Sequence, residues 1–356
     1  KSPLSIRWTG KLRPAISGRY TFSFTSDDGC RLRINNEMLI DAWNGHSVST
    51  DSASIYLEAG KDYQLQAEYY DNRDYAIAKL QWKVPQIGKA TRLDLYGEAG
   101  KAVRECETVV AVMGINKSIE REGQDRYDIQ LPADQREFLQ EIYKVNPNII
   151  LVLVAGSSLA VNWENEHLPA IVNAWYPGEQ GGTAVAEVLF GDYNPAGRLP
   201  LTYYKSLEQL STFDDYDITK GRTYQYFKKD VLYPFGYGLS YTTFKYSNLK
   251  VDDAGKTVNV SFTLKNTGKR AGDEVAQVYV RLPEIAGGTQ AIRQLKGFRR
   301  VALKAGESRK VEITLDREQL RYWDEKQACF VVPQGSFTFM VGASSGDIRL
   351  ENTTNL

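Results

Sequence analysis

The chain has 356 residues, too many for one ordinary hydrophobic core, so its length predicts two or three domains. Lys and Arg together number 44, as do Asp and Glu, and this balance excludes a long-range field that attracts nucleic acid, an anionic membrane or acidic substrates. We therefore expect no nucleic-acid partner. We also expect no membrane partner, since no apolar run approaches the roughly 20 residues that span a bilayer.

The first part of the chain, residues 1–96, predicts an all-β domain. Short runs rich in aromatic and β-branched residues are separated by turn signals such as SDDG and NNE. These runs are RYTFSF, CRLRI, SIYLEAG, YQLQAEYYD and AKLQWKV.

Two features of this domain each allow two interpretations. Asp27 and Asp28 provide oxygen ligands for a possible calcium site, whereas the following Gly29 favours a plain hairpin turn. Four aromatic residues are compatible with either a sugar-stacking platform or core positions, and the sequence does not separate the two. They are Trp43, Tyr69, Tyr70 and Trp82.

Residues 104–212 show the hydrophobic periods of a parallel α/β domain. TVVAVMG and NIILVLVAG are typical of buried strands, whereas ADQREFLQEIYKV and GTAVAEVLFG are typical of amphipathic helices. Pro132 lies near the expected start of the first helix and Gly191 lies past the expected end of the second. Two strands make a thin sheet, so we expect that some strands of this parallel α/β layer are missing from the chain.

The remaining residues predict an ordered connection and a second β domain. Residues 213–245 contain RTYQYF and LYPFGYGLSYTTF, whose many aromatic residues are unlike a flexible linker. Strand-like runs then return at sandwich spacing over residues 246–356. These runs are VNVSFTLKN, EVAQVYVRLP, RQLKGFRRVAL, RKVEITLD and GSFTFMVG.

The acidic loop INKSIEREGQDRYDIQLP carries the main candidates for chemistry. Glu120 and Glu122 follow a predicted strand, and open α/β sheets place their functional groups at the carboxyl ends of strands. Gly123 permits close backbone approach, so either glutamate is a candidate proton donor. The alternative is a solvated acidic pair that Arg121 and Arg126 neutralise.

Other motifs favour structural interpretations. Ser157 and Ser158 follow the second strand, but the G-x-S-x-G motif of a nucleophile elbow is absent, so a turn is the simpler interpretation. The run PGEQGG, residues 177–182, lacks the features of known phosphate loops and favours tight packing at a helix start. With two histidines and three widely spaced cysteines, the chain predicts neither a metal centre nor a disulfide framework. The cysteines are Cys30, Cys106 and Cys329.

Three consecutive segments closely resemble motifs of the family-three glycoside hydrolases, the β-glucosidase-like enzymes. They are IEREGQDRYDIQLP, AWYPGEQGGTAVAEVLFGDYNPAGRLPLTYYKS and YPFGYGLSYTTF. Members of this family typically combine an N-terminal (β/α)8 barrel, an α/β sandwich and a fibronectin type III-like domain. The resemblance implies that residues 104–245 form the second part and residues 246–350 the third.

The opening domain, with RWTGKLRPAISGRYTFSFTSDDGCRLRINNEMLIDAW, resembles the protective-antigen-type β domain that some members carry inserted in the sandwich. The expected fold class is therefore multidomain α and β. It comprises an all-β sandwich or barrel, then a truncated open α/β sandwich, then a fibronectin type III-like β-sandwich.

The resemblance also implies a mechanism. Members are retaining enzymes in which a barrel aspartate attacks the anomeric carbon and a glutamate of the sandwich acts as general acid and then base, with carboxyl groups about 5 to 5.5 Å apart. In members whose loop reads E-G-x-D-R, this glutamate precedes the glycine, which is Glu122 here, with Glu120 as runner-up because loop length varies. Asp125 and Arg126 complete the motif and are expected to shape the loop.

These residues contain no barrel, so we expect the C-terminal part of a larger exo-acting glycosidase that is inactive by itself. Its expected partners are the N-terminal barrel and an oligosaccharide or glycoside substrate, with no required cofactor. Glycosidases of this type are usually secreted or periplasmic. The alternative function is a non-catalytic carbohydrate-binding or adhesive protein that acts through the first β domain, with calcium at Asp27 and Asp28, because protective-antigen-type domains include lectins.

Overall fold

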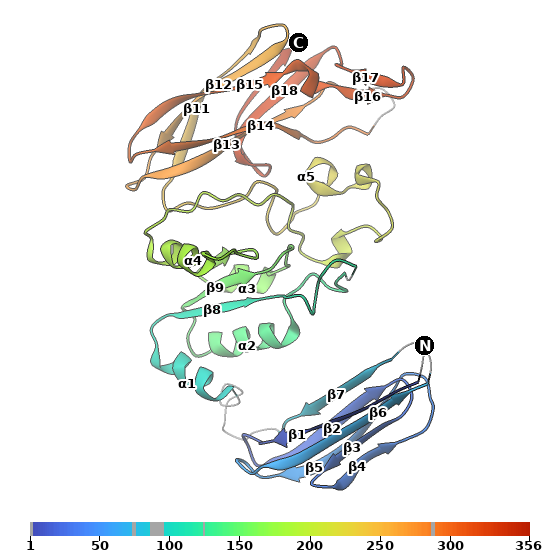
Figure 1. Cartoon of the computed structure of the whole chain (residues 1–356). Helices are drawn as coiled ribbons and strands as arrows, with labels where there is room; N and C mark the ends of the chain where they lie inside the picture. Colours follow the sequence, from blue (N-terminus) through green and yellow to red (C-terminus); the bar gives the residue numbers. More distant parts are fainter. Residues whose placement is uncertain (1–2, 73–75, 86–95, 124, 286–288) are drawn as a thin grey trace. The chain divides into compact units, whose positions relative to one another are not determined.

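The computed structural model describes residues 3–72, 76–85, 96–123, 125–285 and 289–356 (Figure 1). The chain divides into two compact units. Unit 1 comprises Lys1–Glu107 and Gln140–Asn146, and unit 2 comprises Thr108–Leu139 and Pro147–Leu356. Within the described ranges, no helix combines the length and the apolar character that a membrane crossing requires.

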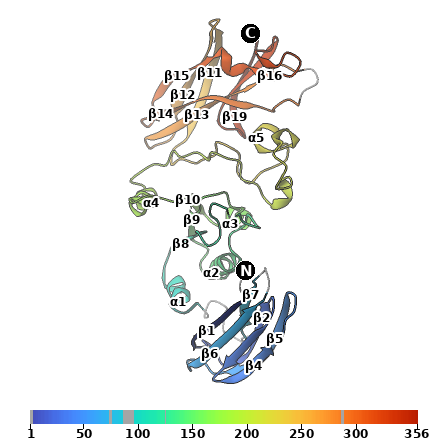
Figure 2. The same cartoon turned by 45° about the vertical axis from the view of Figure 1, so that its right-hand side comes forward.

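Unit 1 consists mainly of two antiparallel β-sheets (Figure 2). Its strands are β1 (Leu4–Leu12), β2 (Gly18–Ser26), β3 (Cys30–Ile34), β4 (Glu37–Ala42), β5 (Ser49–Leu57), β6 (Tyr63–Asp71) and β7 (Ala78–Lys83), and helix α1 (Gly97–Glu105) follows. One sheet has the order β1-β6-β3-β4 and the other β5-β2-β7. Strand β2 buries Tyr20, Phe22 and Phe24 at every second position, as expected for a strand with one face in the core.

The five strands predicted for this region are confirmed as β2, β3, β5, β6 and β7. The sequence did not predict β1 or β4. Strand β1 lies at the edge of its sheet and exposes most of its side chains, so it lacks the alternation that identifies a half-buried strand.

Unit 2 begins with a parallel sheet of order β10-β9-β8. The elements are β8 (Val109–Gly114), α2 (Ala133–Tyr143), β9 (Ile149–Val154), α3 (Asn162–His167), β10 (Ala170–Asn173) and α4 (Gly181–Phe190), of which residues 140–143 of α2 are counted in unit 1. The two predicted strands and two predicted helices are confirmed, with α2 directly after Pro132 and α4 ended by Gly191 in the left-handed conformation, at φ 80°. The third strand, β10, was not predicted, because AIVN is short and only half-buried along its length.

The end of β8 is fixed by close packing and by a side chain from α2. At Gly114, an added Cβ would lie 1.8 Å from the carbonyl oxygen of Val154, so only glycine fits between the two strands. The Gln135 amide accepts from Gly114 N at 2.9 Å and donates to Gly114 O at 2.8 Å. This pair satisfies the last backbone groups of the strand and sets where the following loop begins.

The C-terminal part of unit 2 is a β-sandwich. Its strands are β11 (Phe244–Asp253), β12 (Thr257–Asn266), β13 (Gly272–Arg281), β14 (Gln294–Leu303), β15 (Ser308–Asp316), β16 (Tyr322–Asp324), β17 (Cys329–Val331), β18 (Ser336–Ser344) and β19 (Asp347–Asn355). The sheets β11-β12-β15 and β14-β13-β18-β19 enclose one apolar core, and β16 and β17 form a separate hairpin. The five predicted strands are confirmed as β12, β13, β14, β15 and β18.

Residues 191–243, here called the α4–β11 segment, connect the parallel sheet to the sandwich. The segment contains η2 (Leu207–Gln209), η3 (Ile218–Lys220) and α5 (Thr223–Tyr226). Tyr224 stacks on Phe235 with ring centroids 4.3 Å apart. Arg198 forms an ion pair of 2.7 Å with Glu274 of β13, which ties the segment to the sandwich.

Candidate active site

The loops that leave the carboxyl ends of β8, β9 and β10 meet around one carboxylate. Glu120 comes from the loop after β8, Ser157 follows β9 and Tyr176 follows β10. Carboxyl ends of parallel strands share one edge of a sheet, which is why residues far apart in sequence converge here. With Arg126, these residues form what we call the Glu120 cluster.

Glu120 is held from both of its carboxylate oxygens. Its Oε2 lies 3.1 Å from Arg126 Nε and accepts a short hydrogen bond from the Ser157 hydroxyl. Its Oε1 accepts from the Tyr176 hydroxyl at 3.2 Å. The Glu120 and Arg126 side chains are only 18% and 11% exposed, so the ion pair is shielded from most of the solvent.

Arg126 joins two of the loops directly. Its Nη2 donates to Ser157 Oγ at 2.8 Å and to the Ser158 carbonyl at 2.9 Å. Partial burial raises the pKa of Tyr176, and the adjacent Glu120 carboxylate raises it further, so the phenol stays protonated and donates its hydrogen bond. The cluster therefore fixes the loop geometry.

Glycines permit this close approach. A Cβ on Gly156 would lie 2.5 Å from the Tyr176 ring and 3.1 Å from Glu120 Oε1, so a larger residue would displace the cluster. Gly123, beside Glu122, has φ 72°, a left-handed conformation that favours glycine. The turn that contains Glu122 is therefore set by the local sequence.

Glu122 has different surroundings from Glu120. Its side chain is exposed, and within the described ranges its carboxylate has no hydrogen-bond or ion-pair partner. Arg121 and Asp125 are also exposed. Of the two arginines suspected of neutralising the acidic pair, Arg126 contacts Glu120. Glu122 thus offers an available carboxyl group at the edge of the sheet where such domains bind ligands.

The serine and glycine motifs have structural roles in this geometry. The Ser157 hydroxyl donates a hydrogen bond to Glu120. The His167 ring stacks on Trp163 with ring centroids 4.6 Å apart, and its Nδ1 makes a hydrogen bond with the Trp163 carbonyl. His167 is therefore no base for a serine nucleophile. In the run 177–182, a Cβ on Gly181 would lie 2.4 Å from Pro177, which agrees with tight packing at the start of α4.

In unit 1, Asp28 uses both carboxylate oxygens to join loops. Its Oδ1 accepts from His46 N at 3.2 Å and its Oδ2 from Asn72 N at 2.8 Å. Asp28 is 3% exposed and has φ 62°. The described residues contain no group of three or more His, Cys, Asp or Glu side chains suited to a metal. Calcium binding at Asp27 and Asp28 stays a prediction.

The four aromatic candidates of unit 1 occupy three environments. Tyr69 is a core residue, 1% exposed. Trp82 packs against Phe22, with ring centroids 5.6 Å apart. Trp43 and Tyr70 form an edge-to-face pair at 4.7 Å. Only this last pair brings two of the candidates into contact as a possible stacking surface.

The chain matches two known domain families. The family model described as the glycosyl hydrolase family 3 C-terminal domain matches residues 9–241, and a fibronectin type III-like domain matches residues 274–345. The xylan 1,4-β-xylosidase of Xylanibacter ruminicola is 42% identical over 353 residues, covering 95% of this chain and 40% of that protein. A β-xylosidase of Formosa agariphila is 34% identical over 335 residues, covering 87% of this chain and 46% of that protein.

A solved structure gives the same picture. The β-glucosidase of Kluyveromyces marxianus in complex with glucose superposes with a TM-score of 0.69 at 28% identity, covering 99% of this chain and 44% of that chain. This chain therefore spans less than half the length of these similar proteins.

Proposed function

Because this chain belongs to glycosyl hydrolase family 3, we propose that it is the C-terminal part of a retaining β-glycosidase that removes terminal β-linked xylose or glucose from an oligosaccharide or glycoside. The similar proteins named above are β-xylosidases and a β-glucosidase, which supports this substrate class. In this role the chain supplies one of the two catalytic carboxyl groups.

We propose Glu122 as the general acid and base. The observation that carries this assignment is the contrast between two neighbouring glutamates on one loop. Glu120 is bound by Arg126, Ser157 and Tyr176, whereas Glu122 is exposed and unpartnered among the described residues. A general acid must release and regain its proton in each turnover, and an arginine partner favours the charged form of a carboxyl group.

The nucleophile in this proposal comes from a barrel outside these residues. Double displacement needs a second carboxylate about 5 to 5.5 Å from the acid, on the other side of the scissile bond. Val110 and Val112 are 48% and 65% exposed on one face of β8. Parallel sheets are normally covered on both faces, so these exposed valines support the proposal that further chain packs there.

The acid/base role has a specific kinetic signature. We expect Glu122→Ala, in a polypeptide that carries the family barrel ahead of this chain, to lose roughly 100-fold or more in kcat on an alkyl glycoside. The loss in the glycosylation rate should be much smaller with a dinitrophenyl glycoside, because that leaving group needs no protonation. Added azide should restore turnover and yield a β-glycosyl azide, since a small anion needs no general base to attack the glycosyl intermediate.

Glu120→Ala is the matched control. It removes a carboxyl group two residues away, so we expect its activity loss to be independent of the leaving group and unaffected by azide. Azide rescue of the Glu120 variant, with none for the Glu122 variant, would reverse the assignment.

A further inference from the structure

Tyr176 is the member of the Glu120 cluster that stays open to solvent. It is 49% exposed, whereas the Glu120 and Arg126 side chains are 18% and 11% exposed. Its hydroxyl oxygen lies 3.2 Å from Glu120 Oε1 and 3.3 Å from the Ile115 carbonyl oxygen. The polar end of the side chain is therefore anchored in the cluster, and Tyr176 presents chiefly the surface of a fixed aromatic ring.

The chain on both sides of Tyr176 restricts its orientation. Trp175 has φ 55°, a left-handed conformation that is an outlier for a bulky residue. Pro177 limits the residue before it to extended backbone conformations. The ring packs against Gly156, where an added Cβ would lie 2.5 Å from Tyr176 Cε2. Backbone strain of this kind is typical of ligand sites, and a ring already fixed loses little entropy when a ligand binds.

The surroundings of the ring differ from those of the exposed face of β8. Residues 176–180, YPGEQ, are all exposed, and Glu179 and Gln180 give this loop a carboxylate and an amide. On β8, by contrast, the exposed side chains are those of Val110 and Val112, which suit packing against protein. An aromatic ring on a loop with hydrogen-bonding groups suits a pyranose, which has apolar C–H faces and hydroxyl groups around its edge.

The position of the ring indicates which sugar unit it contacts. Tyr176 binds Glu120, which precedes Glu122 by two residues, and two residues of chain span at most about 7 Å. In the proposed function Glu122 protonates the oxygen of the leaving group, while the nucleophile attacks from the opposite side of the scissile bond. A ring on the loops beside the acid therefore adjoins the leaving group.

We propose that Tyr176 is a specificity-determining residue whose ring is the stacking platform for the first sugar unit of the leaving group. This inference rests on the proposed function, because it takes Glu122 as the general acid. It selects oligosaccharides, whose leaving group is itself a sugar, over glycosides with a small alkyl leaving group.

Pairs of substrates that differ in the leaving group test this role in the barrel-carrying polypeptide. The pairs are xylobiose with methyl β-xyloside and cellobiose with methyl β-glucoside, and the readout is the ratio of kcat/KM within each pair. We expect Tyr176→Ala to lower kcat/KM for the disaccharide roughly 10-fold more than for the methyl glycoside, the scale of one aromatic stacking contact.

Two further variants separate the ring from its hydroxyl. Tyr176→Phe keeps the ring and removes the hydrogen bond to Glu120, so any loss should be equal for both substrates of a pair. Tyr193→Ala is the matched control, because Tyr193 is 42% exposed and its hydroxyl accepts from Arg300 Nη2 at 2.8 Å. It should leave the ratio unchanged.

A ratio that Tyr176→Ala leaves unchanged would overturn the proposal, because the residue would then serve only to anchor Glu120. If the alanine variant does not fold, Tyr176→Leu keeps an apolar side chain without the aromatic ring, and a ratio equal to that of Tyr176→Phe would overturn the proposal in the same way. Failure of the unsubstituted polypeptide to hydrolyse any of these glycosides would instead overturn the proposed function, and the platform with it.

Discussion

Glu120 and Glu122 are separated by one residue and yet have different chemistry available to them. Their difference arises from Arg126 on the same loop and from partners on two other loops, because Ser157 and Tyr176 follow β9 and β10. The sequence identified both glutamates as candidates but did not predict these partners. No local pattern connects residues that converge only when three parallel strands align.

Removing the charge of Glu120 should destabilise unit 2. We expect Glu120→Gln to lower the free energy of unfolding by about 1 to 3 kcal/mol, because it leaves the shielded Arg126 without its counter-charge. Glu122→Gln should change it by less than about 0.5 kcal/mol, as an exposed substitution without partners does. Denaturant titration of both variants checks this, and equal effects would contradict the assigned roles.

A buried glutamate makes stability depend on pH. Glu164 is 2% exposed, and burial raises its pKa, although Arg136 and His167 oppose the shift. The folded protein therefore holds this proton more tightly than the unfolded chain does. Stability from this group is present below the unfolded value, about 4.3, and is lost as pH rises through the raised folded value.

Glu164→Gln should accordingly stabilise the protein near about pH 7 and have little effect near about pH 4. Urea titration at the two pH values measures the difference. Glu166→Gln, at an exposed neighbour on the same helix, is the control and should be neutral at both. A stabilisation of equal size at both pH values would show that the Glu164 proton is not involved.

At the scale of elements, the sequence predicted most strands and helices, and two of the strands that it missed, β1 and β10, are weakly buried. The run IILVLV identifies β9, the central strand, because both of its faces are buried. Strand β10 escaped prediction because each of its four residues is only half-buried. Both β1 and β10 lie at sheet edges and carry little of the hydrophobic pattern on which such predictions depend.

Strand β8 also lies at an edge, and its exposed face makes a prediction about partners. Val112→Lys should change the unfolding temperature of this chain little, because the side chain is 65% exposed. In a polypeptide that carries the barrel, the same substitution should lower the unfolding temperature, because the lysine would be buried.

Val48→Lys is the control at another exposed valine, 53% exposed in unit 1, and should have little effect in either polypeptide. If Val112→Lys has the same small effect in both, this face of β8 is not covered by further chain.

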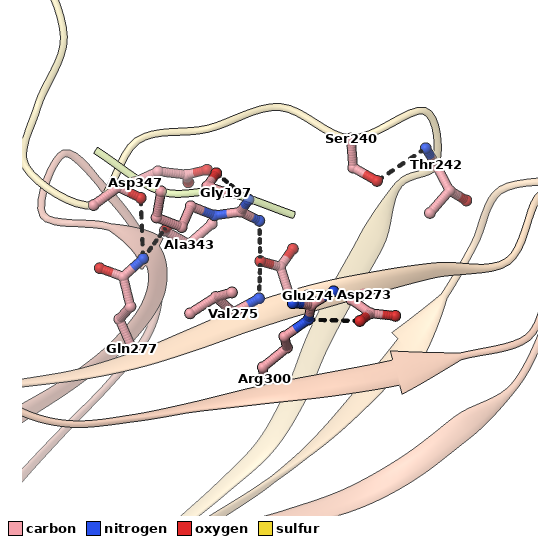
Figure 3. Close-up of polar contacts among 12 residues, drawn as sticks. Gly197, Ser240, Thr242, Asp273, Glu274, Val275, Gln277, Arg300, Ala343 and Asp347 are labelled. Atoms are coloured by element: carbon pink, nitrogen blue, oxygen red, sulfur yellow. Dashed lines mark hydrogen bonds and ion pairs between the residues drawn. The ribbon is translucent and has the colours of Figure 1, made fainter. Parts of the chain in front are cut away.

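At the scale of the whole molecule, the sequence motifs and the family match agree on the fold class. The match to glycosyl hydrolase family 3 spans residues 9–241, and the fibronectin type III-like match lies within the C-terminal sandwich. The contact between the α4–β11 segment and the sandwich was not predicted. The Arg198–Glu274 pair joins residues 76 positions apart, beyond the reach of local patterns (Figure 3).

We propose that these residues supply the general acid and base, Glu122, and that the nucleophile lies outside them. The most direct measurement is the release of p-nitrophenol from aryl β-xylosides and β-glucosides by this chain and by the barrel-carrying polypeptide, each with and without Glu122→Gln. We predict activity only in the longer polypeptide, and a severe loss there on substitution. Hydrolysis by the 356-residue chain alone would contradict the account, because both catalytic carboxylates would then lie within it.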